Sequence, residues 1–552
     1  MARTELDDII AQLDLPDDAV DPRGRQVVKL DPDLIDRPED GNVVLVTAMT
    51  PTPAGEGKTT TTIGLVDGLN RIGHKAIGAL REPSLGPLFG MKGGAIGGGE
   101  SRVIPSDHIN MHFTGDLHAV TAAHNLLSAI VDNHLYFENE PKMDAEGVTW
   151  GRVLDMNDRA LRKCEVGSAT KKGPIRKDRF DITAASEIMA VLCLASDVDD
   201  LQARLDRIIV GTDKEGRPVT AKDLEASGAM AAILLDACRP NLVRTLEDNP
   251  VLVHGGPFAN IAQGTSSLMQ TRLARKLGDI VVTEAGFAFD LGGFKFLDLK
   301  GRAGKLLPDA VVLVVTVRAL RHHGGAAFEA GANVAAVKAG LANIDAHLGA
   351  MKRLGLQPPL IAINMRQGDD DEAELDAIKA FAQEHGSEAV CGNYFAEGGV
   401  GAEDLAKALV QRLDGDSVSR SYAPPYDVTE PFKTKIEKAA AAVFGATGVE
   451  LTDKAEADLK QIESLLQQTG ATDLPVCLAK THLSISDDKK VLGKPDPFVL
   501  KVTGLRVQAG AGFVSVLCGP ILTMPGLPKQ PAAAGVGVVK GEDGARRIVG
   551  LK

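Results

Sequence analysis

Residues 43–70 read VVLVTAMTPTPAGEGKTTTTIGLVDGLN and combine three patterns in one stretch. Residues 43–46 are valine or leucine without a polar interruption, which predicts a buried strand. A turn rich in proline and glycine follows, and behind it four threonines lead into apolar residues at helical spacing. A strand, a glycine-rich loop and a helix start in this order predict a phosphate-binding loop.

The loop supplies chemistry that suits a nucleotide. Backbone N–H groups and the dipole at the start of a helix attract an anion, and Lys58 can neutralise a β- or γ-phosphate. Thr59 would provide the hydroxyl for the Mg²⁺ of Mg-ATP. The predicted nucleotide-binding residues are Thr52, Pro53, Ala54, Gly55, Glu56, Gly57, Lys58 and Thr59.

One position departs from the usual pattern G-x-x-x-x-G-K-[ST]. Thr52 stands where glycine is typical, and prolines on both sides of it should stiffen the loop. Glu56 is unusual beside phosphates, so we expect it either to face solvent or to contact a substrate group. A glycine-rich turn with no ligand is the alternative interpretation of the stretch.

Composition narrows the class of protein. The chain has 552 residues, a formal net charge of −13 and 44% hydrophobic residues, which is typical of a large globular protein and argues against nucleic acid as a partner. The N-terminus is acidic and has no signal-peptide pattern, and no apolar run approaches a membrane span. Six scattered cysteines form no C-x-x-C pair, so we expect a cytoplasmic protein without a zinc site.

Further apolar runs end in glycines and polar residues. They are found at residues 74–80, 251–253, 280–282, 310–317 and 360–363. Unbroken apolar runs indicate strands buried on both faces, so the predicted fold is α/β, with a mostly parallel sheet and helices on both faces. Ligands of such sheets bind at the carboxyl ends of the strands, where Arg81 and Glu82 follow one run. Asp116, at a predicted helix start, is a further candidate for the site.

Helical stripes and breaks in pattern suggest the division of the chain. Stripes fall near residues 373–381, 405–413 and 459–466, and a proline-rich break lies at 422–427. The predicted units are a lead-in at residues 1–40, a nucleotide-binding and activating domain at 41–350, an α/β accessory domain at 351–422 and a C-terminal accessory domain at 423–552.

Long stretches of the chain resemble the formate-tetrahydrofolate ligase family. These stretches are TPAGEGKTTTTIGL, REPSLGP.FG.KGGA.GGG, HFTGD.HA.TAAHNLL, RVLDMNDRALR, VHGGPFANIA, VVTEAGF, PDAVVLV.TVRAL..HGG and TMPGLPK.PAA. The resemblance implies a P-loop NTPase-type core with accessory domains, usually a homotetramer. It also implies an enzyme that uses Mg-ATP and formate to formylate N10 of tetrahydrofolate through formyl phosphate. Whether a monovalent cation is needed stays open.

The resemblance also implies roles for single residues. Lys58 would contact the transferring phosphoryl group, and Arg81 would clamp formate and formyl phosphate, because a guanidinium binds two oxygens at once. Glu82 and Asp116 would orient this arginine or the metal. Together these four residues are the predicted catalytic set.

The acceptor side differs from the family. Residues Glu100 to Arg102 and Gln263 to Ser266 depart from its pattern, and Arg366 stands where the family has an aromatic ring for the pterin. The predicted acceptor-side residues are Phe395, Gly398, Gly399, Arg366 and Glu100, with Phe289 and Phe294 as further aromatic rings. Two alternatives follow: formate activation with another acceptor, such as dihydrofolate, another pterin or an amine, or a non-catalytic nucleotide-binding paralogue.

Overall fold

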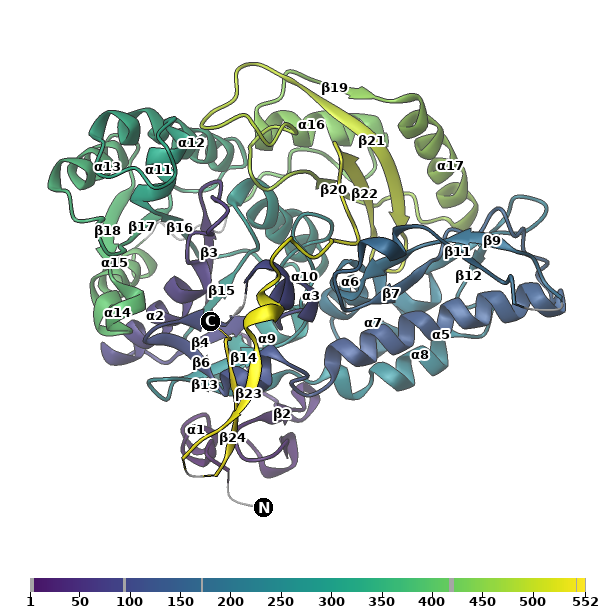
Figure 1. Ribbon diagram of the computed structural model, residues 1–552, viewed down its shortest axis with the longest axis horizontal. Coiled ribbons are helices and arrows are strands. Elements are labelled where there is room, and N and C mark those ends of the chain that lie inside the picture. Colours follow the sequence, from purple (N-terminus) through teal and green to yellow (C-terminus); the bar gives the residue numbers. More distant parts are fainter. Residues whose placement is uncertain (1–3, 93–95, 170–171, 416–420, 543, 552) are drawn as a thin grey trace.

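A large, mostly parallel sheet forms the centre of the computed structural model (Figure 1). The structure describes residues 4–92, 96–169, 172–415, 421–542 and 544–551, so part of the glycine-rich stretch at 90–99 lies outside the described residues. Within these ranges twelve strands belong to the sheet, and ten of them follow the order β1-β2-β13-β14-β4-β15-β3-β16-β17-β18. The strands are β1 (Val20–Pro22), β2 (Val28–Leu30), β3 (Asn42–Ala48), β4 (Ala76–Leu80), β5 (Gly97–Gly98), β6 (Ser101–Ile104), β13 (Asn241–Thr245), β14 (Pro250–Val253), β15 (Ile280–Glu284), β16 (Ala310–Val315), β17 (Leu360–Asn364) and β18 (Glu388–Gly392).

The run from β14 to β18 is parallel throughout, and β13 joins it antiparallel. The apolar runs that predicted strands all lie in this parallel part, which confirms the predicted α/β class. β3, the strand before the phosphate loop, lies between β15 and β16. Its two faces pack into different clusters, with Val43 and Leu45 on one side and Val44 and Val46 on the other. Burying each such side chain stabilises the fold by about 1.5–3 kcal/mol.

Helices cover both faces of the sheet, as an unbroken apolar strand requires. α2 and α15 pack on the face that holds Val44 and Val46, and α12 and α16 pack on the other face. The longer helices are α2 (Lys58–Arg71), α5 (Asp116–Phe137), α6 (Glu187–Leu194), α7 (Val198–Asp206), α8 (Ser227–Leu234), α9 (Leu268–Leu277), α11 (Val317–His323), α12 (Val334–Arg353), α13 (Glu372–Glu384), α15 (Glu403–Leu413), α16 (Phe432–Phe444) and α17 (Asp453–Thr469). The shorter ones are α1 (Asp7–Gln12), α3 (Leu85–Pro87), α4 (Ser106–Asn110), α10 (Arg302–Gly304) and α14 (Tyr394–Glu397).

Two further groups of elements flank the sheet. Helices α5 to α8 share one apolar cluster and lie together to the right of the large sheet in Figure 1. The C-terminal part has a four-stranded sheet of its own, in the order β19-β21-β22-β20. Its strands are β19 (Gly448–Leu451), β20 (Val476–Ala479), β21 (Val499–Gln508) and β22 (Phe513–Cys518). Small two-stranded sheets are formed by β7 (Arg152–Leu154) with β10 (Phe180–Ile182), β8 (Cys164–Val166) with β9 (Arg176–Asp178), β11 (Ile209–Thr212) with β12 (Pro218–Thr220), and β23 (Gly537–Lys540) with β24 (Arg546–Val549).

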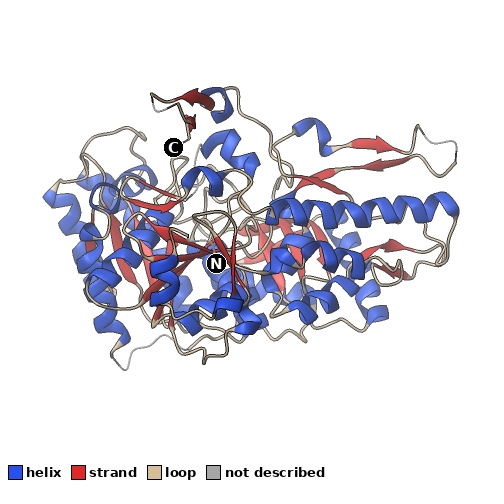
Figure 2. Cartoon of the chain, turned by 90° about the horizontal axis from the view of Figure 1, so that it is seen from below, coloured by secondary structure: helices blue, strands red, loops and turns tan. Residues whose placement is uncertain are grey.

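The segment after β22 returns across the molecule toward the large sheet. The carbonyl of Thr523 accepts a hydrogen bond from the backbone N–H of Ile182 at 2.9 Å, and the carbonyl of Met524 accepts one from the Arg162 side chain at 2.8 Å. The chain then ends in the hairpin of β23 and β24, which stands away from the body of the molecule (Figure 2). No helix in the described ranges is both long and apolar enough to cross a membrane.

Candidate active site

The phosphate loop consists of residues 52–59, the predicted phosphate-binding stretch. It joins β3 to α2 and contains two glycines in left-handed conformations. Gly55 has φ of 74° and Gly57 has φ of 75°, a region that costs residues with a Cβ atom about 1–2 kcal/mol. Gly57 is also the N-cap of α2, and it has no side chain that could occupy the first N–H groups of the helix. The start of α2 is therefore arranged to receive an anion.

Glu56 has neither of the positions predicted for it. Its side chain is buried, and one oxygen accepts hydrogen bonds from the N–H and hydroxyl of Thr52 at 2.7 and 2.9 Å. The other oxygen accepts a hydrogen bond from Thr316 after β16. Because the carboxylate satisfies donors of the loop itself, Glu56 shapes the loop from inside, and Thr52 is its partner.

Asn364, the last residue of β17, and Arg366, two residues further on, both bind backbone carbonyls of the phosphate loop. Asn364 donates to the carbonyl of Glu56 at 2.9 Å, and Arg366 donates to the carbonyl of Gly55 at 2.8 Å. A Cβ atom on Gly57 would lie 2.3 Å from the Asn364 amide nitrogen, so this approach requires glycine. Arg366 was predicted on the acceptor side, but the structure places its guanidinium on the phosphate loop.

Arg81 and Glu284 form an ion pair beside the start of α2. Arg81 follows β4, Glu284 ends β15, and their side chains are 3.1 Å apart. The other Glu284 oxygen accepts a hydrogen bond from the Thr59 hydroxyl at 2.7 Å. Burial opposes the charge of Glu284, but Arg81, Thr59 and the nearby Lys58 hold its pKa below the ordinary value. The carboxylate therefore stays ionised and fixes Arg81 next to Thr59 and Lys58.

Sequence reasoning missed Glu284 as the partner of Arg81. Of the two expected partners, Asp116 is engaged elsewhere, and the role of Glu82 stays a prediction. Asp116 pairs with the buried Lys29 ammonium at 2.7 Å and accepts a hydrogen bond from Asn241 at 2.8 Å. The signal for Glu284 was available, because it ends a buried parallel strand and is followed by Ala-Gly.

Glu82 lies in the same buried region as this ion pair. One of its carboxyl oxygens is buried without a hydrogen-bond partner among the described residues. Burial raises the pKa of Glu82 well above its ordinary value, and the neighbouring Asp116 charge adds to this effect while Lys29 opposes it. Glu82 thus holds a proton more tightly than a carboxyl group in water does.

The acceptor-side residues Phe395 and Glu100 are neighbours in the structure. The backbone N–H of Glu100 donates to the carbonyl of Phe395 at 2.8 Å, and the Ser101 hydroxyl donates to the carbonyl of Tyr394 at 2.7 Å. The ring of Phe395 is 58% exposed and borders Gly98, where a Cβ atom would lie 3.1 Å from it. An exposed ring beside a glycine backbone is available to a flat ligand.

Gly398 and Gly399 serve packing in this arrangement. The N–H of Gly399 donates to Glu247 at 2.7 Å, and a Cβ atom there would lie 2.8 Å from the Cβ atom of Asp67 in α2. A Cβ atom on Gly398 would lie 2.6 Å from a Glu247 oxygen. Gly399 therefore lets the chain after α14 approach α2, and Gly398 lets it approach Glu247, while their contact with the acceptor stays a prediction.

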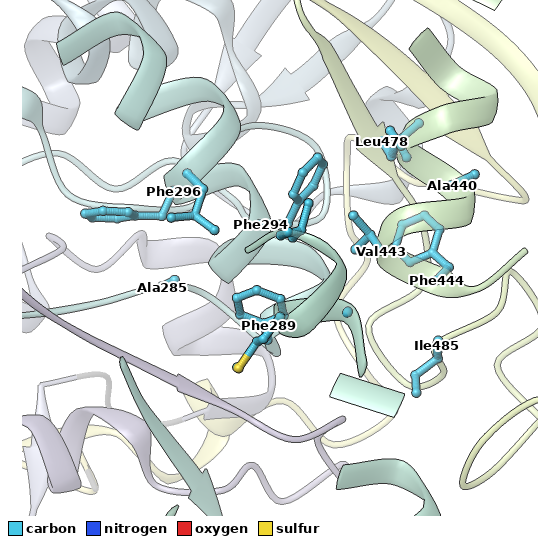
Figure 3. Close-up of a cluster of buried hydrophobic side chains, with 14 of the residues drawn as sticks. Ala285, Phe289, Phe294, Phe296, Ala440, Val443, Phe444, Leu478 and Ile485 are labelled. Carbon is cyan, nitrogen blue, oxygen red and sulfur yellow. The ribbon is translucent and has the colours of Figure 1, made fainter. Parts of the chain in front are cut away.

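The added aromatic rings of residues 289 and 294 belong to the core. Phe289 and Phe294 are 0% and 1% exposed and pack in the cluster shown in Figure 3. They offer no ring to a ligand, so the suggestion that they replace a pterin-stacking residue is wrong. Phe287 differs from them: it has φ of 60°, is half-buried, and stacks on His482 with ring centroids 4.3 Å apart.

Polar groups without partners gather in the loop that contacts Arg81. Pro257 accepts a hydrogen bond from Arg81 at 3.5 Å, and Gly264 accepts one from Gly286 at 2.9 Å. Between them, both amide atoms of the fully buried Gln263 lack a hydrogen-bond partner among the described residues. Unpaired buried amides cost about 1–3 kcal/mol, which marks the loop as a candidate for contact with substrate.

The residues at the start of α2 fit a hard cation bound with a nucleotide. The Thr59 hydroxyl and an ionised Glu284 carboxylate are oxygen ligands of the kind Mg²⁺ prefers, and both lie where the phosphates would enter. Within the described ranges no cluster of three or more His, Cys, Asp or Glu side chains could hold a metal ion alone. A cation here would therefore need phosphate oxygens to complete its ligands.

The fold, with Lys58, Arg81 and Glu284 at this edge of the sheet, is typical of α/β enzymes, whose ligands bind where parallel strands end. Comparison with known proteins gives the family. A family model described as "Formate--tetrahydrofolate ligase" matches residues 1–552. The chain belongs to this family and is an ATP-dependent ligase that forms carbon-nitrogen bonds.

Similar proteins bear the same name. "Formate--tetrahydrofolate ligase" of Methylobacterium sp. (strain 4-46) is 50% identical over 539 residues, which cover 96% of this chain and 95% of the relative. The protein of that name from Paracoccus denitrificans (strain Pd 1222) is 52% identical over 508 residues, covering 92% and 90%. One from Methylobacterium nodulans is 49% identical over 538 residues, covering 96% and 95%.

Proposed function

We propose that this ligase activates formate as formyl phosphate and transfers the formyl group to N10 of tetrahydrofolate, giving 10-formyltetrahydrofolate, ADP and phosphate. A formate oxygen attacks the γ-phosphorus of ATP, and ADP leaves. N10 then attacks the formyl carbon, phosphate leaves with the oxygen that came from formate, and N10 loses a proton. Family membership supports the substrates, and the Arg81–Glu284–Thr59 contacts support the first step.

The charges at the site suit phosphoryl transfer. Lys58 begins α2, whose open N–H groups would bind phosphate oxygens, and Arg81 can contact formate and the transferring group with two N–H groups at once. Glu284 holds Arg81 in place and stays ionised, so the arginine is oriented before substrate arrives. Mg²⁺ bound with ATP would neutralise phosphate charge beside Thr59 and Glu284.

Labelled formate tests the acyl-phosphate step directly. With [¹⁸O]formate, ATP and tetrahydrofolate, we expect one ¹⁸O atom in each released phosphate, measured by mass spectrometry. Lys58→Ala and Arg81→Ala should lower product formation by at least 100-fold, since each removes a cation from the transferring group. Unlabelled phosphate during turnover would disprove formyl phosphate. Labelled phosphate without formylated tetrahydrofolate would instead point to another acceptor.

Other features of the proposal have different support. Mg²⁺ as the metal is favoured by the Thr59 and Glu284 oxygens, and a cytoplasmic location by the cysteine pattern. Two features rest on the family resemblance alone: a homotetrameric assembly and a need for a monovalent cation. Light scattering of the purified chain measures the first, and turnover with and without added K⁺ measures the last.

A further inference from the structure

A cavity of about 350 Å³ lies between the α5 to α8 group and the C-terminal sheet. Its walls come from the chain around β7, β10 and β11 on one side and from α17, β21 and β22 on the other. Neither the phosphate loop nor Arg81 is among the described residues that line it. Its size lies within the range of sites for small organic ligands, about 300–1,000 Å³.

The charged side chains in its wall neutralise one another. Asp181 lies 3.5 Å from Arg179 and 3.3 Å from Arg506, and Asp458 contacts Lys454 and the backbone N–H of Leu505. Bringing in a charged ligand would require desolvating it without a free counter-charge, which is costly in a buried site. The wall therefore favours an uncharged ligand.

Two further ionisable groups in the wall are neutral near pH 7. Burial lowers the pKa of His124 to about 3, so its imidazole is uncharged. Burial raises the pKa of Glu187 to about 8, although the N–H groups of Gly510 and Ala511 donate to its carboxyl and oppose the shift. Neither group adds net charge to the cavity.

Three polar atoms in the wall lack a partner among the described residues. They are His124 Nδ1, Gln508 Oε1 and Ser515 Oγ. The His124 Nε2 atom lies 3.3 Å from the carbonyl of Gly151, which assigns the ring proton to Nε2 and leaves Nδ1 as an acceptor. Each unpaired buried atom costs about 1–3 kcal/mol. A molecule with both donors and acceptors would recover this cost.

The remaining wall is apolar and includes an aromatic surface. His124 stacks on Trp150 with ring centroids 4.1 Å apart and an interplanar angle of 19°. Ile261, Ile462 and Leu465 complete this part of the wall. Apolar and aromatic surfaces combined with a few polar atoms are typical of sites for flat heteroaromatic molecules.

We propose that this cavity binds a small, uncharged heteroaromatic molecule that carries an amide or amino group, at a site separate from the nucleotide site. Donors of the ligand would reach His124 and Gln508, and an acceptor would reach the Ser515 hydroxyl. Ile261 connects this site to the loop that contacts Arg81, because it lies in the same loop as Pro257 and packs against Ile182 and Ala185. On the basis of the proposed function, we expect a ligand bound in this cavity to change the KM for formate.

Calorimetric titration with nicotinamide and pyrazinamide tests the site. Both probes are uncharged, and nicotinate is the charged counterpart of nicotinamide. We expect saturable binding of at least one amide, at least tenfold weaker binding of nicotinate, and amide binding at least tenfold weaker in Gln508→Leu. Ser515→Ala removes the hydroxyl of another wall residue and should weaken amide binding by a smaller factor. The control Gln467→Leu replaces an exposed glutamine on α17 outside the cavity and should bind like the unsubstituted protein.

A crystal of the full chain soaked with the bound amide should show it against Trp150 and Gln508. No saturable binding of either amide, equal binding by the wall variants, or density for water alone in the cavity would overturn the proposal. The titration needs no turnover, so failure of the formate ligase reaction would leave its result unaffected. If the KM for formate stayed the same with the amide bound, only the connection through Ile261 to Arg81 would be rejected, and the binding site itself would stand.

Discussion

Asp116 shows how a residue can have the chemistry of a catalytic acid and yet stabilise the structure. It is 2% exposed and neutralises the fully buried ammonium of Lys29, which reaches it from the N-terminal strand β2. Such a buried ion pair contributes less stability than its Coulomb attraction suggests, because both charges lose their hydration. Removing one partner is nevertheless destabilising, because it leaves the other charge buried and unpaired.

We therefore expect Asp116→Ala to lower the free energy of unfolding by about 3–5 kcal/mol, since among the described residues it leaves the buried Lys29 ammonium only the Arg239 carbonyl as an acceptor. Chemical denaturation of the purified variant measures this loss. The double variant Lys29→Met/Asp116→Leu serves as the control and should recover most of the stability. A single variant that unfolds like the unsubstituted protein, yet has lost turnover, would assign Asp116 to catalysis instead.

At the scale of elements, the start of α2 carries the phosphate loop. Gly55 and Gly57 share the left-handed conformation, but their surroundings differ. A Cβ atom on Gly57 would collide with Asn364, whereas nothing lies within 4 Å of a Cβ atom on Gly55. Alanine at either position would have backbone strain, but only alanine at position 57 would also collide with a neighbour. The two substitutions therefore form a matched pair of variants.

Gly57→Ala should raise the KM for ATP by at least tenfold, because the Asn364 amide must leave the carbonyl of Glu56. Gly55→Ala has only the conformational strain of about 1–2 kcal/mol and should have a smaller effect. Steady-state kinetics of the two variants at saturating formate and folate provide the comparison. Equal KM values in both variants would show that the Asn364 contact does not hold the loop.

The middle of α2 is attached to the antiparallel edge of the sheet by a buried carboxyl group. Asp67 accepts hydrogen bonds from Thr245 at 2.6 Å and Asn249 at 2.7 Å, while its other oxygen has no partner among the described residues. Burial raises the pKa of Asp67 to about 7, although these two hydrogen bonds oppose the shift.

This pKa predicts how stability changes with pH. Between about pH 4 and pH 7 the unfolded chain loses the proton of Asp67 and the folded protein keeps it, so this group makes the fold less stable as pH rises. Asp67→Asn keeps an acceptor and removes the titration. The Tm difference between Asp67→Asn and the unsubstituted protein should therefore increase from pH 4 to pH 7 and stay constant above pH 7. Asp404→Asn, at an exposed carboxylate on α15, is the control. Parallel Tm profiles for all three proteins would contradict the buried titration.

At the scale of the whole molecule, the sequence was sufficient for most of the buried parallel strands and insufficient for their order. Strands buried on both faces leave apolar runs, and for this reason β3, β4, β14, β15, β16 and β17 could be predicted. Nothing in residues 42–48 indicates that the partners of β3 come from residues 280–315, because strand pairing depends on contacts distant in the sequence.

The site was predictable to the same degree. The loop motif and the rule on strand ends pointed to Lys58 and Arg81, which the structure brings to one edge of the sheet. Glu284 was missed although its position at the end of a buried strand is a signal, because an acidic chain offers many carboxylates and this signal does not show which of them reaches Arg81. Arg366 was misplaced for a different reason: the family position of an aromatic ring does not show where a flexible guanidinium finds its acceptor.

The position of β3 also has a consequence for biosynthesis. This strand is made within the first tenth of the chain, yet both of its neighbours follow more than 200 residues later, with β15 at Ile280–Glu284 and β16 at Ala310–Val315. During translation its backbone edges and valine side chains therefore stay uncovered until more than half of the polypeptide has left the ribosome. Exposed strand edges of this kind promote aggregation, so the nascent chain is expected to depend on chaperones until β16 is available.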